Sequence, residues 1–268
     1  MKALTLVAGF GIAGIVLAQG GFTYRSPKEN PNLIISGKSG WVELDKNFEV
    51  TGGVKLESKP DKFTLLGDRI SGDLIKENKQ TVADHIQVRG TVMFTQQQQN
   101  GDVKISGKEA DYNLLNADLA RAVLRGGVKL DFTSTDAKAG STDITASSVE
   151  ATFKRKTAKD EDSLVSANMT GPVSYTGVGS SEKGKSTISA KADRMTYELK
   201  EDGAELKLAG NLYFSQKGPG DEESADVSGA QGVILTLNKA KEVVRVRMSS
   251  EGVGKIVTKI KKKGGSQA

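Results

Sequence analysis

A glycine at the centre of an alternating apolar segment occurs five times in this chain and constrains its fold more than any other feature. In the range 205–214 the centre is Gly210, and the apolar residues on the same side of a period-two strand are Leu206, Leu208, Leu212 and Phe214. The same pattern surrounds Gly52, Gly90, Gly126 and Gly171. Five copies in one phase predict an all-β repeat protein.

The repeated glycine indicates where each strand changes direction. Glycine weakens a strand interior, so a recurring one marks a sharp bend or a close approach of two backbones. Strands that all bend at this position would form a folded sheet with an apolar inner face. Alternatively, glycine relieves crowding in an ordinary sandwich core. Both hypotheses place the alternating apolar residues inside, and they differ on whether the interior is filled or open.

A second motif precedes these strands: an aliphatic residue, a residue that is usually Ser or Thr, and then Gly or Ala. Its six copies begin at Ile35, Leu65, Ile105, Ile144, Ile188 and Val227. In five of the six, the apolar phase slips by one residue after the motif, which is what a β-bulge produces. Each repeat is therefore predicted to be an antiparallel hairpin of two bent strands. Polar segments at 96–101, 154–162, 177–185 and 217–223 are the predicted connections.

The chain is predicted to begin with a targeting segment. Lys2 is followed by the apolar run Ala3–Ala18, which is typical of a signal peptide cleaved after Ala18. A retained membrane anchor is the alternative. The predicted organisation continues with a polar lead-in at 19–32, the repeat domain at 33–254 and a basic tail at 255–268. The leucine- and alanine-rich range 114–124 lies between two repeat halves, and we expect it to be strand–turn–strand rather than helix.

The composition offers little chemistry. There is no cysteine and a single histidine, His85, so neither a zinc site nor a nucleophile–base pair can be assembled from these residue types. A net charge of +5 over 268 residues is too small to indicate nucleic-acid binding. We therefore expect a non-enzymatic protein without a cofactor or metal.

Two repeats carry a family resemblance. One runs from Ala110-Asp-Tyr112 to Leu124-Arg-Gly-Gly-Val128, and the other from Ala192-Asp193 through Tyr197 to Leu208-Ala-Gly-Asn-Leu212. They resemble the OstA-like repeat of lipopolysaccharide-transport proteins, the family of LptA, LptC and the periplasmic domain of LptD. The resemblance extends over about 33–248. The repeat at 146–173 departs from it, with Pro172 where the family prefers Asn.

This resemblance implies a β-jellyroll or β-taco whose apolar groove receives acyl chains. It also implies transfer of a lipopolysaccharide-like glycolipid across the periplasm, without catalysis, as part of a bridge to the outer membrane. The candidate lipid-binding residues face inward at the strand centres, where they could equally form a plain core. They are Val50, Val54, Val88, Val92, Phe94, Leu124, Val128, Leu130, Met169, Val173, Leu206, Leu208, Leu212 and Phe214.

The two ends of the sheet are the predicted assembly sites, because an exposed strand edge invites pairing with another chain. The first edge comprises Trp41, Val42 and Leu44, and the last comprises Val244, Val246 and Met248. Head-to-tail contact with a second copy or another OstA-like protein is expected, unless the basic tail covers the last edge. Two functional alternatives remain: a structural or adhesive repeat protein with a filled core, and an LptC-like accessory anchored in the inner membrane.

Overall fold

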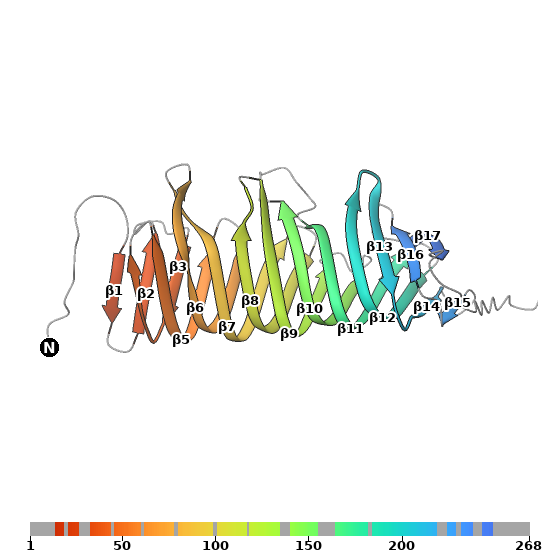
Figure 1. Cartoon of the computed structure of the whole chain (residues 1–268), viewed down its shortest axis with the longest axis horizontal. Coiled ribbons are helices and arrows are strands. Elements are labelled where there is room, and N and C mark those ends of the chain that lie inside the picture. Colours follow the sequence, from red (N-terminus) through yellow and green to blue (C-terminus); the bar gives the residue numbers. More distant parts are fainter. Residues whose placement is uncertain are drawn as a thin grey trace, which may run out of the picture. The chain divides into compact units, whose positions relative to one another are not determined.

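The structure is a computed structural model that describes residues 14–18, 21–26, 33–43, 46–59, 62–77, 80–98, 101–116, 118–134, 140–154, 164–181, 184–218, 224–228, 232–237 and 243–248. Over these residues the fold is all-β with antiparallel strands, as the alternating pattern predicts (Figure 1). The strands are β1 Gly14–Ala18, β2 Gly21–Ser26, β3 Leu33–Gly37, β4 Ser39–Glu43, β5 Asn47–Ser58, β6 Phe63–Glu77, β7 Gln80–Gln98, β8 Gly101–Leu114, β9 Leu119–Ser134, β10 Ser141–Lys154, β11 Leu164–Ser181, β12 Gly184–Lys200, β13 Gly203–Ala209, β14 Tyr213–Lys217, β15 Ser224–Ser228, β16 Gly232–Leu237 and β17 Val243–Met248.

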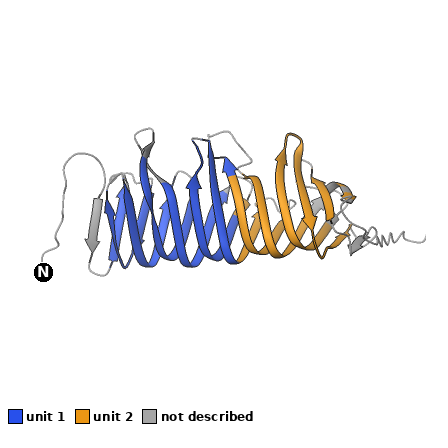
Figure 2. Ribbon diagram, viewed as in Figure 1, with its two compact units in different colours: residues 1–98, 103–126, 153–163 blue, residues 99–102, 127–152, 164–268 orange. Residues whose placement is uncertain are grey.

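The chain divides into two compact units (Figure 2). Unit 1 comprises residues 1–98, 103–126 and 153–163, and unit 2 comprises residues 99–102, 127–152 and 164–268. The predicted strand–turn–strand at 114–124 is confirmed, since β8 ends at Leu114 and β9 begins at Leu119. The connection predicted at 177–185 is shorter, because β11 continues to Ser181 and β12 begins at Gly184.

In unit 1 the two halves of β5 pair with different strands. Its first half pairs with β4 and its last residues, 55–58, pair with β3, so β3 and β4 are two halves of one bent strand. Beyond this bent strand, β2 pairs with β3 and β1 pairs with β2. On the other side, β6 pairs along β5 and β7 along β6. The repeated hairpin predicted from the motifs is therefore present.

Unit 2 is built in the same way around β12. Residues 187–191 of β12 pair with β14, and residues 194–200 pair with β13, so β13 and β14 also form one bent strand. Beyond it, β15 pairs with β14, β16 pairs with β13, and β17 pairs with β16. On the other side, β11 pairs along β12. The two halves of the bent strand thus pair with different outer strands, so that a separate series of paired strands extends from each half.

The five repeated glycines lie at the bends, as the sequence predicts. Each has a positive φ, between 73° at Gly210 and 94° at Gly90, in the region that residues with a Cβ rarely adopt. A Cβ added at Gly90 would overlap the side chain of Asp68 on the neighbouring strand. Both conformation and close approach therefore require glycine at this position.

The extra residue of each bulge lies in the glycine-centred strand, not in the preceding strand where we expected it. Across the first bend the buried Val50 and Val54 are four positions apart on β5, whereas the buried Gly67 and Ile70 are three apart on β6. The same excess occurs on β7 opposite β6 and on β11 opposite β12. The apolar phase of the motif strand does shift at the bend, because this strand crosses the bend with one residue fewer than the glycine-centred strand beside it.

The sheet begins earlier than the predicted repeat domain. Within the expected lead-in at 19–32, β2 pairs with β3 and buries Phe22 and Tyr24, which are 2% and 1% exposed. The last residues of the expected leader form β1. The basic tail at 255–268 and the start of the leader lie outside the described residues.

Candidate functional site

The predicted lipid-binding residues line the inside of the bent strands. All of them are buried except Phe94 and Leu130, which are half-buried. Val50, Val92 and Phe214 are completely inaccessible, and Leu208 is 1% exposed. The structure thus places the predicted set inside, where water does not reach most of its members.

Close to the bends of unit 1 the interior is filled by side chains from facing positions. A Cβ added at Gly37 would overlap Val50, and one added at Gly67 would overlap Val88. The Gly or Ala of the second motif therefore faces inward, where only a very small residue fits. These contacts explain the glycine in the first two copies of the motif.

Toward the ends of some strands large side chains are only half-buried, although Phe48 near the start of β5 is 1% exposed. In unit 1, the half-buried rings of Phe63 and Phe94 lie 5.6 Å apart on β6 and β7. In unit 2, Phe132 and Tyr175 are half-buried. The hydroxyl of Tyr175 forms a hydrogen bond with the side chain of Thr142. Burial raises the pKa of the Tyr175 phenol, so the hydroxyl stays neutral at physiological pH. Each unit therefore has half-buried aromatic side chains away from its bends.

Some of these aromatic residues were missed in the sequence. Phe132 falls outside the glycine-centred segment 122–130 but continues its period of two, whereas Phe63 alternates with Leu65 of the second motif. Phe22 and Tyr24 also alternate, but they precede the first glycine motif. Extending the phase of 122–130 would have identified Phe132, and extending the phase of the Leu65 motif toward the N-terminus would have identified Phe63.

A shallow depression of about 520 Å³ lies over the bends of unit 2. It is lined by Thr170, Gly171, Pro172, Asp193, Arg194, Ala209 and Gly210. Asp193 and Arg194 are exposed, and Asp193 accepts a hydrogen bond from the Asn211 side chain at 2.9 Å. This depression is separate from the apolar residues predicted to contact lipid.

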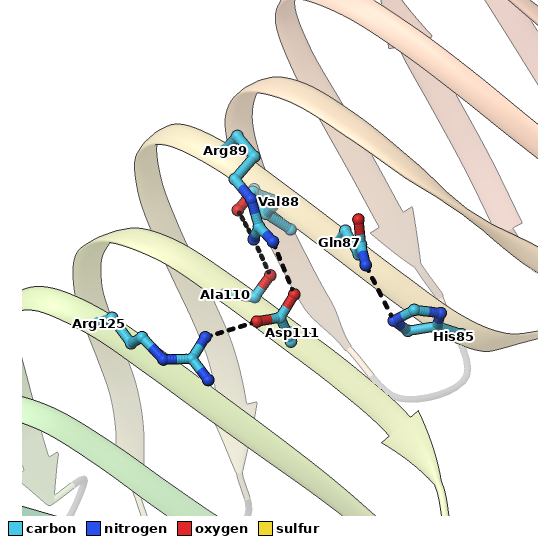
Figure 3. Close-up of polar contacts among 7 residues, drawn as sticks. All are labelled: His85, Gln87, Val88, Arg89, Ala110, Asp111 and Arg125. Atoms are coloured by element: carbon cyan, nitrogen blue, oxygen red, sulfur yellow. Dashed lines mark hydrogen bonds and ion pairs between the residues drawn. The ribbon is translucent and has the colours of Figure 1, made fainter.

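Charged residues connect neighbouring strands near the bends of unit 1. Asp111 on β8 lies between Arg89 on β7 and Arg125 on β9, at 3.1 and 2.7 Å (Figure 3). Arg89 also donates to the backbone carbonyl of Ala110 at 3.3 Å. Partial burial raises the pKa of Asp111, but the hydrogen bonds from Arg125 and Arg89 outweigh it and hold the pKa below the ordinary value of 3.8.

Replacing Asp111 with asparagine is expected to lower the free energy of unfolding by about 1 kcal/mol at pH 7, because two charge-assisted hydrogen bonds are lost. Since the folded pKa is lowered, this difference from the parent chain should be complete above the ordinary pKa and vanish as the pH falls through the folded value. Urea unfolding between pH 2 and 7 measures it. Glu49→Gln is the control: it removes one ion pair, with Arg69, and should lower the free energy of unfolding by less than Asp111→Asn does. An equal loss at all pH values would contradict this account.

A carboxyl pair in unit 2 has the opposite electrostatics. Asp143 is hydrogen-bonded to Asp131, and this bond, together with desolvation and like-charge repulsion, raises the pKa of Asp143. Lys129 lies 2.8 Å from Asp131 and offsets part of the repulsion. The pair lies at the surface of two adjacent strands, β9 and β10.

The predicted assembly edges are only partly visible. Trp41 is 50% exposed on β4, and Val42 beside it is half-buried against the core. Leu44 lies outside the described residues. Val244, Val246 and Met248 belong to β17, whose backbone pairs with β16, while their side chains are not among those described.

The remaining candidate chemistry is sparse. His85 is partly exposed and lies 3.7 Å from Asp73, on the strand that pairs with its own. Among the described residues, no group of three or more His, Cys, Asp or Glu side chains could hold a metal ion. The same part of the chain contains no helix long and apolar enough to cross a bilayer. Comparison with protein-family models, curated proteins and solved structures gives no match.

Proposed function

We propose that this protein binds the acyl chains of a lipopolysaccharide-like glycolipid and passes the lipid on, without catalysis, as one segment of a route across the periplasm. The observation that carries the proposal is the bent-strand interior, which is apolar in both units and has half-buried aromatic side chains away from its bends. The resemblance of two repeats to the OstA-like family supports the same function. The predicted signal peptide supports export.

The energetics suit transfer rather than storage. Burying a methylene group contributes about 0.8 kcal/mol, so a saturated chain of ~14 carbons gains on the order of 10 kcal/mol relative to water. A bilayer offers nearly the same gain. An apolar interior that matches the bilayer neither traps nor repels its lipid, and the direction of transfer then comes from an energy source elsewhere.

The burial of the interior favours a second candidate, a structural repeat protein with a filled core. Leu208 and Phe214 are 1% and 0% exposed, as in an ordinary sandwich. For lipid to enter, the half-buried residues must admit an acyl chain and the facing strand halves must separate. The two candidates therefore differ in whether the interior opens.

Photocrosslinking distinguishes the two candidates. A photoreactive residue at Phe94 or Leu208 should become attached to an acyl chain of copurified or added lipid. The same probe at Lys207, which is exposed and adjacent to Leu208, should not. Attachment from Phe94 alone would restrict lipid to the outer part of the interior. No attachment from either position would support the filled-core scaffold.

The edges at the ends of the sheet support a partner of the same fold. Among the described strands, β4 pairs only with β5, β15 only with β14, and β17 only with β16. Unpaired backbone groups at such edges favour the addition of a strand from another chain. Head-to-tail assembly with a second copy would join segments of the proposed route.

A further inference from the structure

The N-terminal end of the sheet is uneven. The bent strand formed by β3 and β4 is the last one that has both halves, and β2 continues the ladder beyond β3. No described strand continues it beyond β4. Without β1, this end therefore extends one strand further on one half of the bend than on the other.

The C-terminal end of the sheet is also uneven. Beyond the bent strand of β13 and β14, β15 continues the ladder from β14, and both β16 and β17 continue it from β13. Among the described strands, one half is thus extended by one strand and the other by two.

These two ends are complementary when β1 is absent. In a head-to-tail contact, β15 of one copy and β2 of the next would fill one ladder, while β16 and β17 would fill the other and meet β4. Two strands would then separate the two bent strands in both ladders. The strand directions also agree, because antiparallel pairing of β15 with β2 and of β17 with β4 requires β3 and β4 to run the same way, as one bent strand does.

Strand β1 disturbs this match. Gly14–Ala18 pairs with Arg25–Gly21 over five residues and occupies the free edge of β2. It adds a third strand to one ladder only, an offset of roughly 4.8 Å, which is one strand spacing. A second copy could then pair with one half of the end but not with both.

We propose that Gly14–Ala18 is a removable cap on a strand-docking site, and that its loss by cleavage after Ala18 opens the N-terminal end to β15 and β17 of a second copy. This inference rests on the head-to-tail assembly in the proposed function. The cap keeps the unprocessed chain monomeric, so assembly follows processing.

Engineered disulfides test the cap in the full chain, which has no cysteine of its own. Val16 and Thr23 are register partners, so Val16→Cys/Thr23→Cys should oxidise readily and lock β1 onto β2. Ile15→Cys/Thr23→Cys is shifted by one residue, which places the two side chains on opposite faces, and it should oxidise poorly. Equal oxidation of both pairs would overturn the register and the cap.

Sedimentation then compares the locked chain with one whose cap is released. Val16→Pro removes a backbone donor from β1 and should release it. This variant should reach at least twice the monomer mass at concentrations where the oxidised, locked chain stays a monomer. Val16→Pro/Val244→Pro should return to the monomer mass, because the second proline disturbs the β17 edge. It also controls for association through the apolar leader.

Each remaining outcome decides the proposal. A locked chain that associates as strongly as the released one, or a released chain that stays monomeric, would overturn it. Lipid crosslinking from Phe94 in the same variants is an independent readout, because Phe94 lies on β7, outside the strands that carry the substitutions. Failure of the lipid proposal would abolish crosslinking in every variant and leave the mass differences unchanged.

Discussion

Replacing Leu208 with aspartate is expected to lower the free energy of unfolding by at least about 3 kcal/mol, because the side chain is buried and a charge there would have no partner. Leu208 lies on β13, is 1% exposed, and pairs with Met195 on one side and Val233 on the other. Both neighbours are completely inaccessible. Neither offers a group that could hydrogen-bond a carboxylate. Urea unfolding at pH 7 measures the effect.

Two control substitutions isolate the cause. Lys207→Gln changes the exposed neighbour on the same strand and should cost less than about 1 kcal/mol, since it removes only a surface ion pair with Glu205. Leu208→Met keeps the volume apolar and should cost less than about 1.5 kcal/mol. If Leu208→Asp left the melting temperature unchanged and abolished lipid crosslinking, the empty interior would be open to water. A large decrease in the free energy of unfolding would mean that the interior of the lipid-free chain is closed to water.

The second large effect is expected at a bend. Gly90→Ala should destabilise the protein by about 2 kcal/mol or more, because a φ of 94° is strained for alanine and its Cβ would overlap Asp68. The displaced Asp68 side chain also accepts a hydrogen bond from the backbone N–H of Thr91 at 3.2 Å. The substitution therefore disturbs both strands of the bend.

Gly53→Ala is the matched control, since Gly53 has a positive φ of 68° and no atom within 4 Å of an added Cβ. It should show only the conformational cost, on the order of 1 kcal/mol. Thermal or urea unfolding of the two variants gives the difference, which reports the steric part alone. Equal destabilisation would mean that the Asp68 side chain moves aside without cost.

The alternation of apolar residues determined the strands and the side of each strand that is buried. Because side chains on a strand alternate between two faces, period two is sufficient to assign a face. The recurrence of glycine in one phase determined the bends, since positive φ is costly for every other residue. Both inferences are local, so Gly52 and Gly210 could be interpreted without knowledge of their neighbours.

Only the tertiary structure decided how far apart the facing halves lie and where the sheet ends. Period two assigns Leu208 to the interior but says nothing of the distance to the opposite half, which depends on contacts such as those at Gly37 and Gly67. Likewise, the link between Asp111 and two arginines depends on pairing register across three strands. Strands β1 and β2 lack the glycine motif, and their place is set by pairing with the bent strand beside them. A repeat pattern reports the contacts that every repeat makes with its neighbours. The strands at the ends of the sheet lack a neighbour on one side, so the pattern does not predict them.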